Sequence, residues 1–431
     1  MAGAELGELS IVGAPYVARA MSALHKGHSL ALEDRLPALR KAASLFASAT
    51  VGGLSVAEYQ HLACRISGLN ISEIRRSTED LAEQIVLAHD NAQRARPSGT
   101  VTSFRNPEAR TGTAVWVRRG SVFGVHAAGN HPGVHAGWLE ALALGYRIAV
   151  RPSRREPLTA HRLVLALWAA GFGRDEVISL PTDHEAADEL IRAADLSMVY
   201  GGDEVIRKHA GSPRVLTQGP GRSKVLLTAD VDWREYVAFI ADSVSHGGGT
   251  SCRNTTAVFV EDHAAEVAEA VAEQLAKLPV LPPEDDEAVL PVLPLPAAMR
   301  IEDYLRRAAT GTTPFLGGQG VVDELGDGSA CLRPSVHLLN EPGEAQAGVE
   351  LAFPCVWVGP WKPDSGVLPV KHTLALTVLG GTGDLHEQLI EEPTIRNVYA
   401  GPFPTYWTAP EIPHDNYLAD FLMESKGFVS L

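Results

Sequence analysis

Residues 121–151 read SVFGVHAAGNHPGVHAGWLEALALGYRIAVR. Two short apolar runs, at 121–126 and 147–150, enclose a stretch with helical spacing at 133–144. The runs have the length of β-strands, and the stretch between them is long enough to return the chain across the face of a sheet. This order predicts a β-α-β unit with two parallel strands.

The same alternation continues beyond this unit. Apolar runs at 176–180 and 196–200 alternate with helical patterns at 158–170 and 185–194. Helices that connect parallel strands cover both faces of the sheet. A strand pattern at 257–260, followed by another helical pattern, opens a second such unit. The sequence therefore predicts an α/β protein with two α/β units.

Three other segments depart from this alternation. Residues 1–100 have mostly helical spacing, and residues 111–123 alternate between apolar and polar side chains as a β-hairpin does. Residues 279–296 carry six prolines around an acidic run. We expect this last segment to be an exposed excursion.

Composition limits the class of protein. At 431 residues the chain is too long for one ordinary core, and its 45% apolar and 21% charged residues are normal for a soluble enzyme. The net charge of -15 argues against a surface for nucleic acid or anionic membranes. No apolar run is long enough to span a bilayer, and the acidic N-terminus lacks the layout of a signal peptide. We expect a cytoplasmic protein.

The cysteines are too few and too dispersed for a structural site. Cys64, Cys252, Cys331 and Cys355 lie far apart, with no Cys-x-x-Cys pair and no histidine at ligand spacing. Neither a disulfide framework nor a metal site is indicated.

One cysteine lies in a distinctive loop. Residues 245–260 read SHGGGTSCRNTTAVFV and place Cys252 in a glycine-rich bend between a helical pattern and a strand pattern. Such a bend can bring backbone N–H groups to a sulfur atom without crowding, and these groups favour the reactive thiolate. The loop suggests a nucleophile, although a small buried residue beside a flexible turn is the alternative.

The parallel sheet suggests a dinucleotide, yet the usual fingerprint is absent. The glycine pairs Gly171/Gly173 and Gly219/Gly221 both lack the final glycine of a Gly-x-Gly-x-x-Gly motif, and no phosphate-binding loop of the Walker type occurs.

Four segments instead occur in a fixed order upstream of the cysteine. They read FGVHAAGNHP at 123–132, IAVRPSR at 148–154, VYGGD at 199–203 and QGPGRS at 218–223, the last beginning 34 positions before Cys252. Their order and spacing resemble the aldehyde dehydrogenase superfamily over about residues 30–431. The resemblance implies a Rossmann-like domain that binds a nicotinamide cofactor, a second α/β catalytic domain and a small oligomerisation hairpin.

The resemblance also assigns roles to individual residues. It makes Cys252 the nucleophile and Asn130 the side-chain donor to the oxyanion, where the alternative for Asn130 is an ordinary turn residue. His246 is a candidate for proton transfer or, alternatively, the end of a helix. The implied cofactor contacts are Arg151, Ser153, Arg154, Gly201, Gly202, Gln218, Gly219 and, if the register slips by one residue, Glu350. Because Arg154 stands where NAD-using relatives commonly have glutamate, we expect NADPH to be preferred, with NAD possible; a solvated helix start is the alternative for Arg154.

One departure from the family pattern concerns the base. Gln218 stands where hydrolytic members have a glutamate that activates water, and an amide cannot accept that proton. We therefore expect slow hydrolysis of the acyl-enzyme, as in the acylating branch and the related acyl-CoA reductases, including the fatty acid reductase of bacterial luminescence and reductases of aromatic secondary metabolism. The C-terminal segment 412–428, IPHDNYLADFLMESKGF, also resembles that branch.

The expected reaction is the NAD(P)H-dependent reduction of an acyl thioester, with CoA as acyl carrier, to an aldehyde through a Cys252 thioester. Oxidation of an aldehyde to an acid or to acyl-CoA is one alternative. An inactive dehydrogenase-like partner of an acid-activating ligase is another. We expect domains at 1–224, with the hairpin near 111–123, at 225–395 and at 396–431. By resemblance, the protein is expected to be a homodimer or a dimer of dimers.

Overall fold

The computed structural model describes residues 6–430, which form two compact units. The N-terminal unit consists of residues 6–63, 75–219 and 416–430. The cysteine unit includes Cys64–Ile74 and Pro220–Asp415. Within residues 6–430, the main chain passes from one unit to the other at 63/64, 74/75, 219/220 and 415/416.

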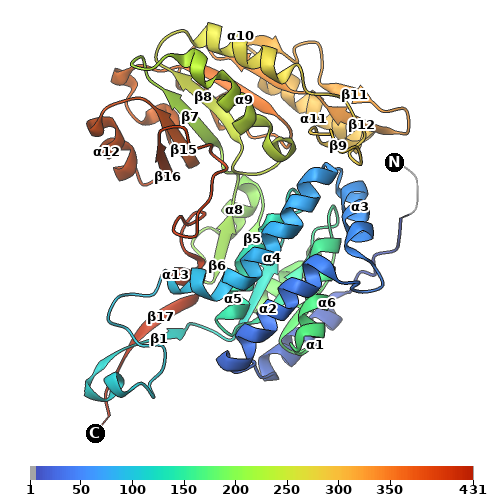
Figure 1. The fold of residues 1–431 in the computed structure, drawn as a ribbon, viewed down its shortest axis with the longest axis vertical. Coiled ribbons are helices and arrows are strands. Elements are labelled where there is room, and N and C mark those ends of the chain that lie inside the picture. The colour runs from blue at the N-terminus through green and yellow to red at the C-terminus, as the bar shows by residue number, and fades with distance from the viewer. Residues whose placement is uncertain (1–5, 431) are drawn as a thin grey trace. The chain divides into compact units, whose positions relative to one another are not determined.

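A five-stranded parallel sheet forms the centre of the N-terminal unit (Figure 1). Its strand order is β4-β3-β2-β5-β6, so the chain first adds strands on one side of β2 and then continues on the other side with β5. The carboxyl ends of β2 and β5 therefore mark the switch point of the sheet. The alternation predicted from sequence is confirmed, and the strands are β2 (Val122–His126), β3 (Arg147–Arg151), β4 (Val177–Ser179), β5 (Leu196–Tyr200) and β6 (Val215–Gln218).

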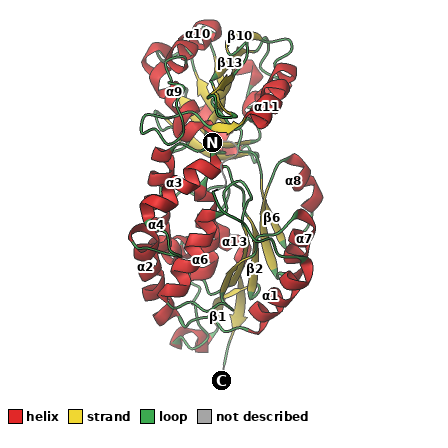
Figure 2. Cartoon of the chain, turned by 90° about the vertical axis from the view of Figure 1, so that its right-hand side faces the viewer, coloured by secondary structure: helices red, strands yellow, loops and turns green. Residues whose placement is uncertain are grey.

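Helices cover both faces of this sheet (Figure 2). α1 and α7 pack together on one face, while α5 and α6 contact the sheet from the other and are covered by α2. α7 begins where the Asp183 carboxylate caps the Ala186 N–H at 2.8 Å, and α6 ends at Gly171, whose φ of +124° suits glycine. The helices that belong wholly to this unit are α1 (Ala14–Lys26), α2 (Leu32–Ser48), α5 (Ala136–Ala143), α6 (Leu158–Ala170), α7 (His184–Ala193), α8 (Asp203–His209) and α13 (Leu418–Leu422). Two more helices, α3 (Val56–Ser67) and α4 (Ile71–Gln93), are shared between the two units.

A two-stranded antiparallel ribbon pairs β1 (Thr113–Arg118) with β17 (Met423–Phe428). The hairpin expected over residues 111–123 does not form locally, because the end of that segment enters β2 in the parallel sheet. Alternation along β1 identified a strand correctly, but its partner is about three hundred residues away in sequence, and a local pattern cannot reveal such a pairing.

The cysteine unit contains a seven-stranded sheet in the order β10-β13-β14-β8-β7-β15-β16, in which only the edge strand β10 is antiparallel to its neighbour. Buried apolar side chains pack on both faces of this sheet. Its strands are β7 (Ser223–Leu227), β8 (Thr255–Val260), β10 (Thr313–Leu316), β13 (Ser335–Leu338), β14 (Cys355–Pro360), β15 (Thr373–Leu379) and β16 (Ile395–Ala400). The helices of the unit are α9 (Val237–Ser245), α10 (Ala264–Leu275), α11 (Leu295–Ala308) and α12 (Gly383–Glu391).

A smaller three-stranded sheet corrects one expectation. It consists of β9 (Val292–Pro294), β11 (Val322–Glu324) and β12 (Ser329–Leu332). The proline-rich segment 279–296 supplies β9, and its Leu290, Val292 and Leu293 are buried, so the segment is only partly an exposed excursion. Proline is compatible with a short strand when it stands at the strand's end, as Pro294 does.

Short 3₁₀ helices connect these elements, at Pro107–Thr111, Pro132–His135, Trp233–Tyr236, His246–Gly249, Ala345–Gly348, Pro363–Ser365 and Leu368–Val370. Within residues 6–430, no helix is both long enough and apolar enough to cross a membrane. The N-terminal run used for the cytoplasmic prediction begins in residues 1–5, outside the described part, and that location stays a prediction.

Candidate active site

The loop that carries Cys252 is shaped by three glycines. α9 ends at Ser245, and Gly247, Gly248 and Gly249 follow with φ of +56°, +81° and +67°. Other residues rarely adopt this left-handed conformation. A Cβ atom on Gly249 would also lie 2.5 Å from the backbone nitrogen of Pro354. The glycines therefore allow the sharp turn between helix and strand that the sequence predicted.

Buried polar groups hold the loop in place. The Asn254 side chain accepts a hydrogen bond from the Ser251 N–H at 2.9 Å and donates to the His246 carbonyl at 2.9 Å. Ser223 Oγ donates to the Cys252 carbonyl at 3.1 Å. A Cβ on Gly221 would stand 1.9 Å from that same carbonyl oxygen, so only glycine allows this approach. The backbone of the nucleophile loop is thus fixed from several directions.

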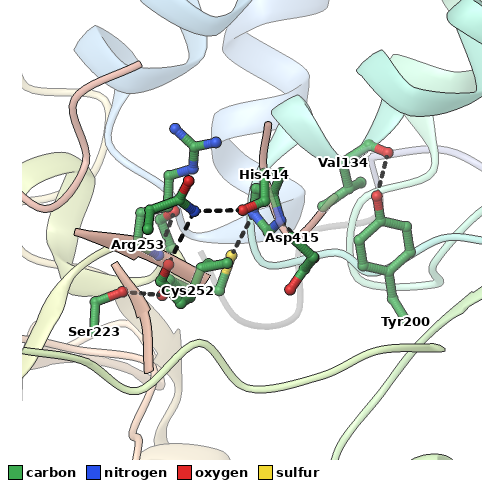
Figure 3. Close-up of polar contacts among 10 residues, drawn as sticks. Val134, Tyr200, Ser223, Cys252, Arg253, His414 and Asp415 are labelled. Carbon is green, nitrogen blue, oxygen red and sulfur yellow. Dashed lines mark hydrogen bonds and ion pairs between the residues drawn. The ribbon is translucent and has the colours of Figure 1, made fainter. Parts of the chain in front are cut away.

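Cys252 forms a chain of polar contacts with His414 and Asp415 (Figure 3). His414 Nε2 lies 3.3 Å from Cys252 Sγ, and His414 Nδ1 lies 2.7 Å from Asp415 Oδ2. Because a carboxylate only accepts hydrogen bonds, Nδ1 carries a proton and Nε2 is the atom that can take one from the thiol. A nucleophile, a base and a group that orients the base therefore lie in line, as covalent catalysis requires.

The charges of this cluster reinforce one another. Burial opposes the charged imidazolium, but attraction to the Cys252 thiolate and hydrogen bonds to Asp415 and Cys252 outweigh it and raise the pKa of His414 to about 9. Burial likewise opposes the charged Asp415, yet the hydrogen bond and positive charge of His414 keep its pKa below the usual range. The His414 side chain remains 39% exposed, so water screens part of this attraction and can exchange protons with the ring.

His414 was not among the residues singled out from sequence. His246, named as a candidate for proton transfer or as the end of a helix, is the C-cap of α9 and stacks on Tyr406 with ring centroids 3.5 Å apart and planes at 9°. Tyr406 in turn donates to Asp242 at 2.5 Å. His414 lies 162 positions from Cys252, so no local spacing links them. The adjacent His-Asp pair in the C-terminal segment was the only signal available.

Glu350 supports the backbone next to the nucleophile loop. Its Oε2 accepts the Arg222 N–H at 2.7 Å, in a turn where Arg222 has a φ of +48°. On the carbonyl side of the same turn, buried Lys224 donates to the Arg222 carbonyl at 2.9 Å. Burial raises the pKa of Glu350 and lowers that of Lys224 to about 7. The Glu350 carboxylate is therefore already engaged by backbone, and its predicted contact with the cofactor stays a prediction.

The other residues assigned from the resemblance lie in the N-terminal unit. Asn130 is half-buried in the loop that follows β2. Arg151 ends β3 and is buried, with its guanidinium 2.7 Å from His126 Nε2 and 3.3 Å from the Thr182 carbonyl. Ser153 follows it and is half-buried, and Arg154 is exposed to solvent.

The carboxyl ends of β2 and β5 have features that suit a dinucleotide. Ligands of parallel α/β sheets bind where the strand order reverses. Gly201 and Gly202 follow β5 there, and a Cβ on Gly202 would meet only open space. Gln218 ends β6 beside Tyr200 and accepts the Gly201 N–H through its carbonyl at 3.0 Å; Gly219 follows it. The backbone at Gly202 is therefore open to a close approach by phosphate, so these residues fit a nicotinamide dinucleotide.

Comparison with known proteins decides the family. The sequence model described as "Aldehyde dehydrogenase family" matches residues 13–363. The chain belongs to the aldehyde dehydrogenase family. The superfamily resemblance read from the sequence is thereby confirmed.

Two curated relatives of this family member are semialdehyde dehydrogenases. A 2-hydroxymuconic semialdehyde dehydrogenase from Pseudomonas sp. (strain CF600) is 24% identical over 274 residues, which are 59% of this chain and 55% of the relative. A malonate-semialdehyde dehydrogenase from Bacillus cereus is 23% identical over 198 residues, 44% of this chain and 41% of the relative. The chain thus spans about half the length of the curated relatives it matches. Both are named as dehydrogenases, so the acyl-CoA reductase branch stays a proposal.

Solved structures confirm the fold over nearly the whole chain. Indole-3-acetaldehyde dehydrogenase from P. syringae, in complex with NAD+, superposes with a TM-score of 0.83 at 17% identity, covering 99% of this chain and 90% of the other. Glyceraldehyde-3-phosphate dehydrogenase from Methanocaldococcus jannaschii DSM 2661, complexed with NADP, superposes with a TM-score of 0.77 at 14% identity, covering 99% of this chain and 96% of the other. The predicted aldehyde dehydrogenase-like fold, with its Rossmann-like sheet, is confirmed.

Proposed function

We propose that this aldehyde dehydrogenase family member is an NAD(P)-dependent oxidoreductase that oxidises an aldehyde through a thioester on Cys252. The observation that carries the proposal is the contact of Cys252 with His414, which is itself hydrogen-bonded to Asp415. The curated relatives described above are named as semialdehyde dehydrogenases, and their names support the same direction.

The reaction begins with proton transfer from the Cys252 thiol to His414 Nε2. The thiolate then attacks the aldehyde carbon, and Asn130 remains the proposed donor to the resulting oxyanion on the strength of the resemblance. A bound oxidised nicotinamide would supply the hydride acceptor that oxidation of the sulfur adduct to a thioester requires. Gly201, Gly202, Arg151, Ser153, Arg154 and Gly219 are the residues proposed to hold the cofactor.

The second half of the reaction needs a base again. His414 must first release the proton that it took from the thiol, and its 39% exposure gives that proton a route to solvent. Neutral His414 can then accept a proton from a water molecule that attacks the thioester, and the acid leaves. Gln218 led us to expect that water could not be activated. His414 is a second candidate base, within the cysteine unit, and the slow hydrolysis expected from Gln218 stays a prediction.

The reductive reading remains as a second candidate, and Gln218 is the observation that favours it. If His414 serves only to form and release the thiolate, the thioester is left to exchange with CoA or to be reduced by NAD(P)H to an aldehyde. In this reading the acyl donor is a CoA thioester, and an acid-activating ligase would be the partner that supplies it. The proposed oligomer, a dimer that uses the β1–β17 ribbon, is common to both readings.

A product assay separates the two. The purified protein is mixed with a panel of aldehydes and either NAD+ or NADP+, with and without CoA, and in parallel with acyl-CoA thioesters and NADPH. We expect acid as the product without CoA, and no turnover in Cys252→Ala. Turnover of aldehydes only when CoA is present, with acyl-CoA as the product, or aldehyde formed from acyl-CoA and NADPH, would support the reductive branch instead. No change in nicotinamide absorbance with any substrate, in either direction, would overturn both.

A further inference from the structure

A buried asparagine contacts the backbone of the catalytic histidine. Asn397 lies on β16 with 9% of its surface exposed. Its Nδ2 donates to the His414 carbonyl at 2.7 Å and to the Leu374 carbonyl at 3.0 Å. One amide group therefore joins the chain segment that carries His414 to strand β15.

The same strand residue also fixes the nucleophile. The Leu374 N–H donates to the Gly221 carbonyl at 2.8 Å. Gly221 packs directly against the carbonyl of Cys252, where no Cβ would fit. The carbonyl of Leu374 thus anchors the base, through Asn397, while its N–H anchors the nucleophile, through Gly221.

This common anchor matters because the Sγ–Nε2 distance is set by two separate pieces of chain. His414 belongs to the segment 401–415, which has no regular helix or strand, whereas Cys252 immediately precedes β8. Another contact of that segment, in which Thr405 Oγ1 donates to the Arg253 carbonyl at 2.6 Å, lies nine residues before His414. Asn397 contacts the backbone of His414 itself, so it controls where the imidazole stands.

We propose that Asn397 is a positioning residue that sets His414 at hydrogen-bonding distance from Cys252. Its contribution to catalysis rests on the proposed function, in which His414 is the base. Asn397 touches neither the thiol nor the imidazole ring, and it acts only through the His414 backbone.

The test replaces the amide donor while keeping the shape of the side chain. In Asn397→Asp, a carboxylate oxygen would face two carbonyl oxygens, and their repulsion would move the His414 segment. Asn397→Thr keeps one hydroxyl donor, so its rate of Cys252 alkylation should lie between those of the wild type and the aspartate variant. Asn340→Asp is the matched control, because its Nδ2 also donates to a carbonyl, that of Gly311 at 2.8 Å, but at an exposed site after β13.

The readout is the rate at which iodoacetamide alkylates Cys252 as a function of pH, followed by mass spectrometry of the cysteine peptide. We expect Asn397→Asp to slow alkylation at pH 7 by roughly tenfold, because two hydrogen bonds are lost. At pH 10, where a free thiol ionises by itself, the rate should equal that of the wild type. A variant that merely loosened the fold would expose the thiol and alkylate faster at every pH.

The outcomes distinguish this proposal from the proposed function. The alkylation assay needs neither cofactor nor substrate. If Asn397→Asp slows alkylation while the wild type shows no oxidoreductase activity, the positioning role is retained and the proposed function is rejected. Wild-type alkylation in a folded Asn397→Asp or Asn397→Thr, together with slowed alkylation in His414→Gln, would overturn the positioning role alone. If Asn397→Asp does not fold, the alkylation rate of Asn397→Thr decides whether Asn397 positions His414.

Discussion

Replacing His414 by glutamine removes the base while keeping a polar side chain of similar length. The structure gives His414 two functions, since Nε2 faces Cys252 Sγ at 3.3 Å and Nδ1 is held by Asp415 at 2.7 Å. Glutamine can fill the space but cannot accept the thiol proton. The variant should therefore fold normally and lose the activated thiolate.

The size of the effect follows from thiol ionisation. An ordinary cysteine is only a few per cent thiolate at pH 7. If the proton resides on His414 in the wild type, alkylation by iodoacetamide at pH 7 should fall by about thirtyfold in His414→Gln. Turnover should fall further, by roughly a hundredfold to ten-thousandfold, because the same group also activates the attacking water.

The pH dependence has a defined sign. The pKa of His414 is raised to about 9, so the imidazolium is present below that pH and is lost above it. The advantage of the wild type in alkylation should thus diminish as pH rises through about 9, where the imidazolium is lost. The stabilisation that the charged ring gives the folded state should likewise be complete below the ordinary histidine pKa and lost as pH rises through 9.

Asp415→Asn provides the internal comparison. This variant leaves the imidazole in place without its carboxylate partner. We therefore expect a smaller fall in the alkylation rate at pH 7, on the order of tenfold. Because Asp415 acts only through His414, the double variant should behave like His414→Gln alone. Alkylation of His414→Gln within twofold of the wild type at pH 7, measured by stopped flow on folded protein, would refute the assignment of His414 as the base.

Three further predictions concern other residues. Gln218→Glu should raise acid formation from acyl-CoA without NAD(P)H at least tenfold, because a carboxylate would stand where the family resemblance places a general base; product analysis that shows no increase would argue against that alignment. Arg154→Glu should raise the KM for NADPH ten- to a hundredfold more than that for NADH, and equal use of both cofactors by the wild type would contradict the phosphate contact. Burial raises the pKa of Glu140 to about 7, so ionisation penalises the folded state increasingly between the unfolded value near 4.3 and pH 7, by on the order of 4 kcal/mol. Glu140→Gln should therefore have the higher Tm at pH 8 and an equal Tm at pH 4; an equal Tm at both would show that the carboxyl is solvated.

Much of the fold could be predicted because its signals are local. The strands β2, β3 and β5 are apolar runs bounded by helical spacing, and a parallel sheet built from such units has few possible topologies. The pairing of β1 with β17 could not be predicted, since the two strands are joined only in space. The buried part of the proline-rich segment was missed because its composition resembles that of a loop.

The candidate site was predicted only in part, for the same physical reason. Cys252 could be identified because the glycines that shape its loop are adjacent to it in sequence. His414 and Asn397 reach the site through the tertiary fold, one from an irregular segment and one from the last strand of the large sheet. A histidine chosen for being near the cysteine in sequence, His246, instead stacks on Tyr406. Glu350, which was considered for the cofactor only if the register slips by one residue, accepts the Arg222 N–H, and its cofactor contact stays a prediction.

The most direct test of the proposed chemistry is to trap the acyl group on Cys252. The protein is mixed with an aldehyde that it oxidises and with NAD(P)+, quenched in acid within milliseconds, digested, and examined by mass spectrometry. We predict that the wild-type peptide containing Cys252 gains the mass of the acyl group and that the corresponding peptide of Cys252→Ala does not. The acylated peptide should accumulate more in the wild type than in Gln218→Glu. Turnover by Cys252→Ala, or an acylated residue other than Cys252, would contradict it.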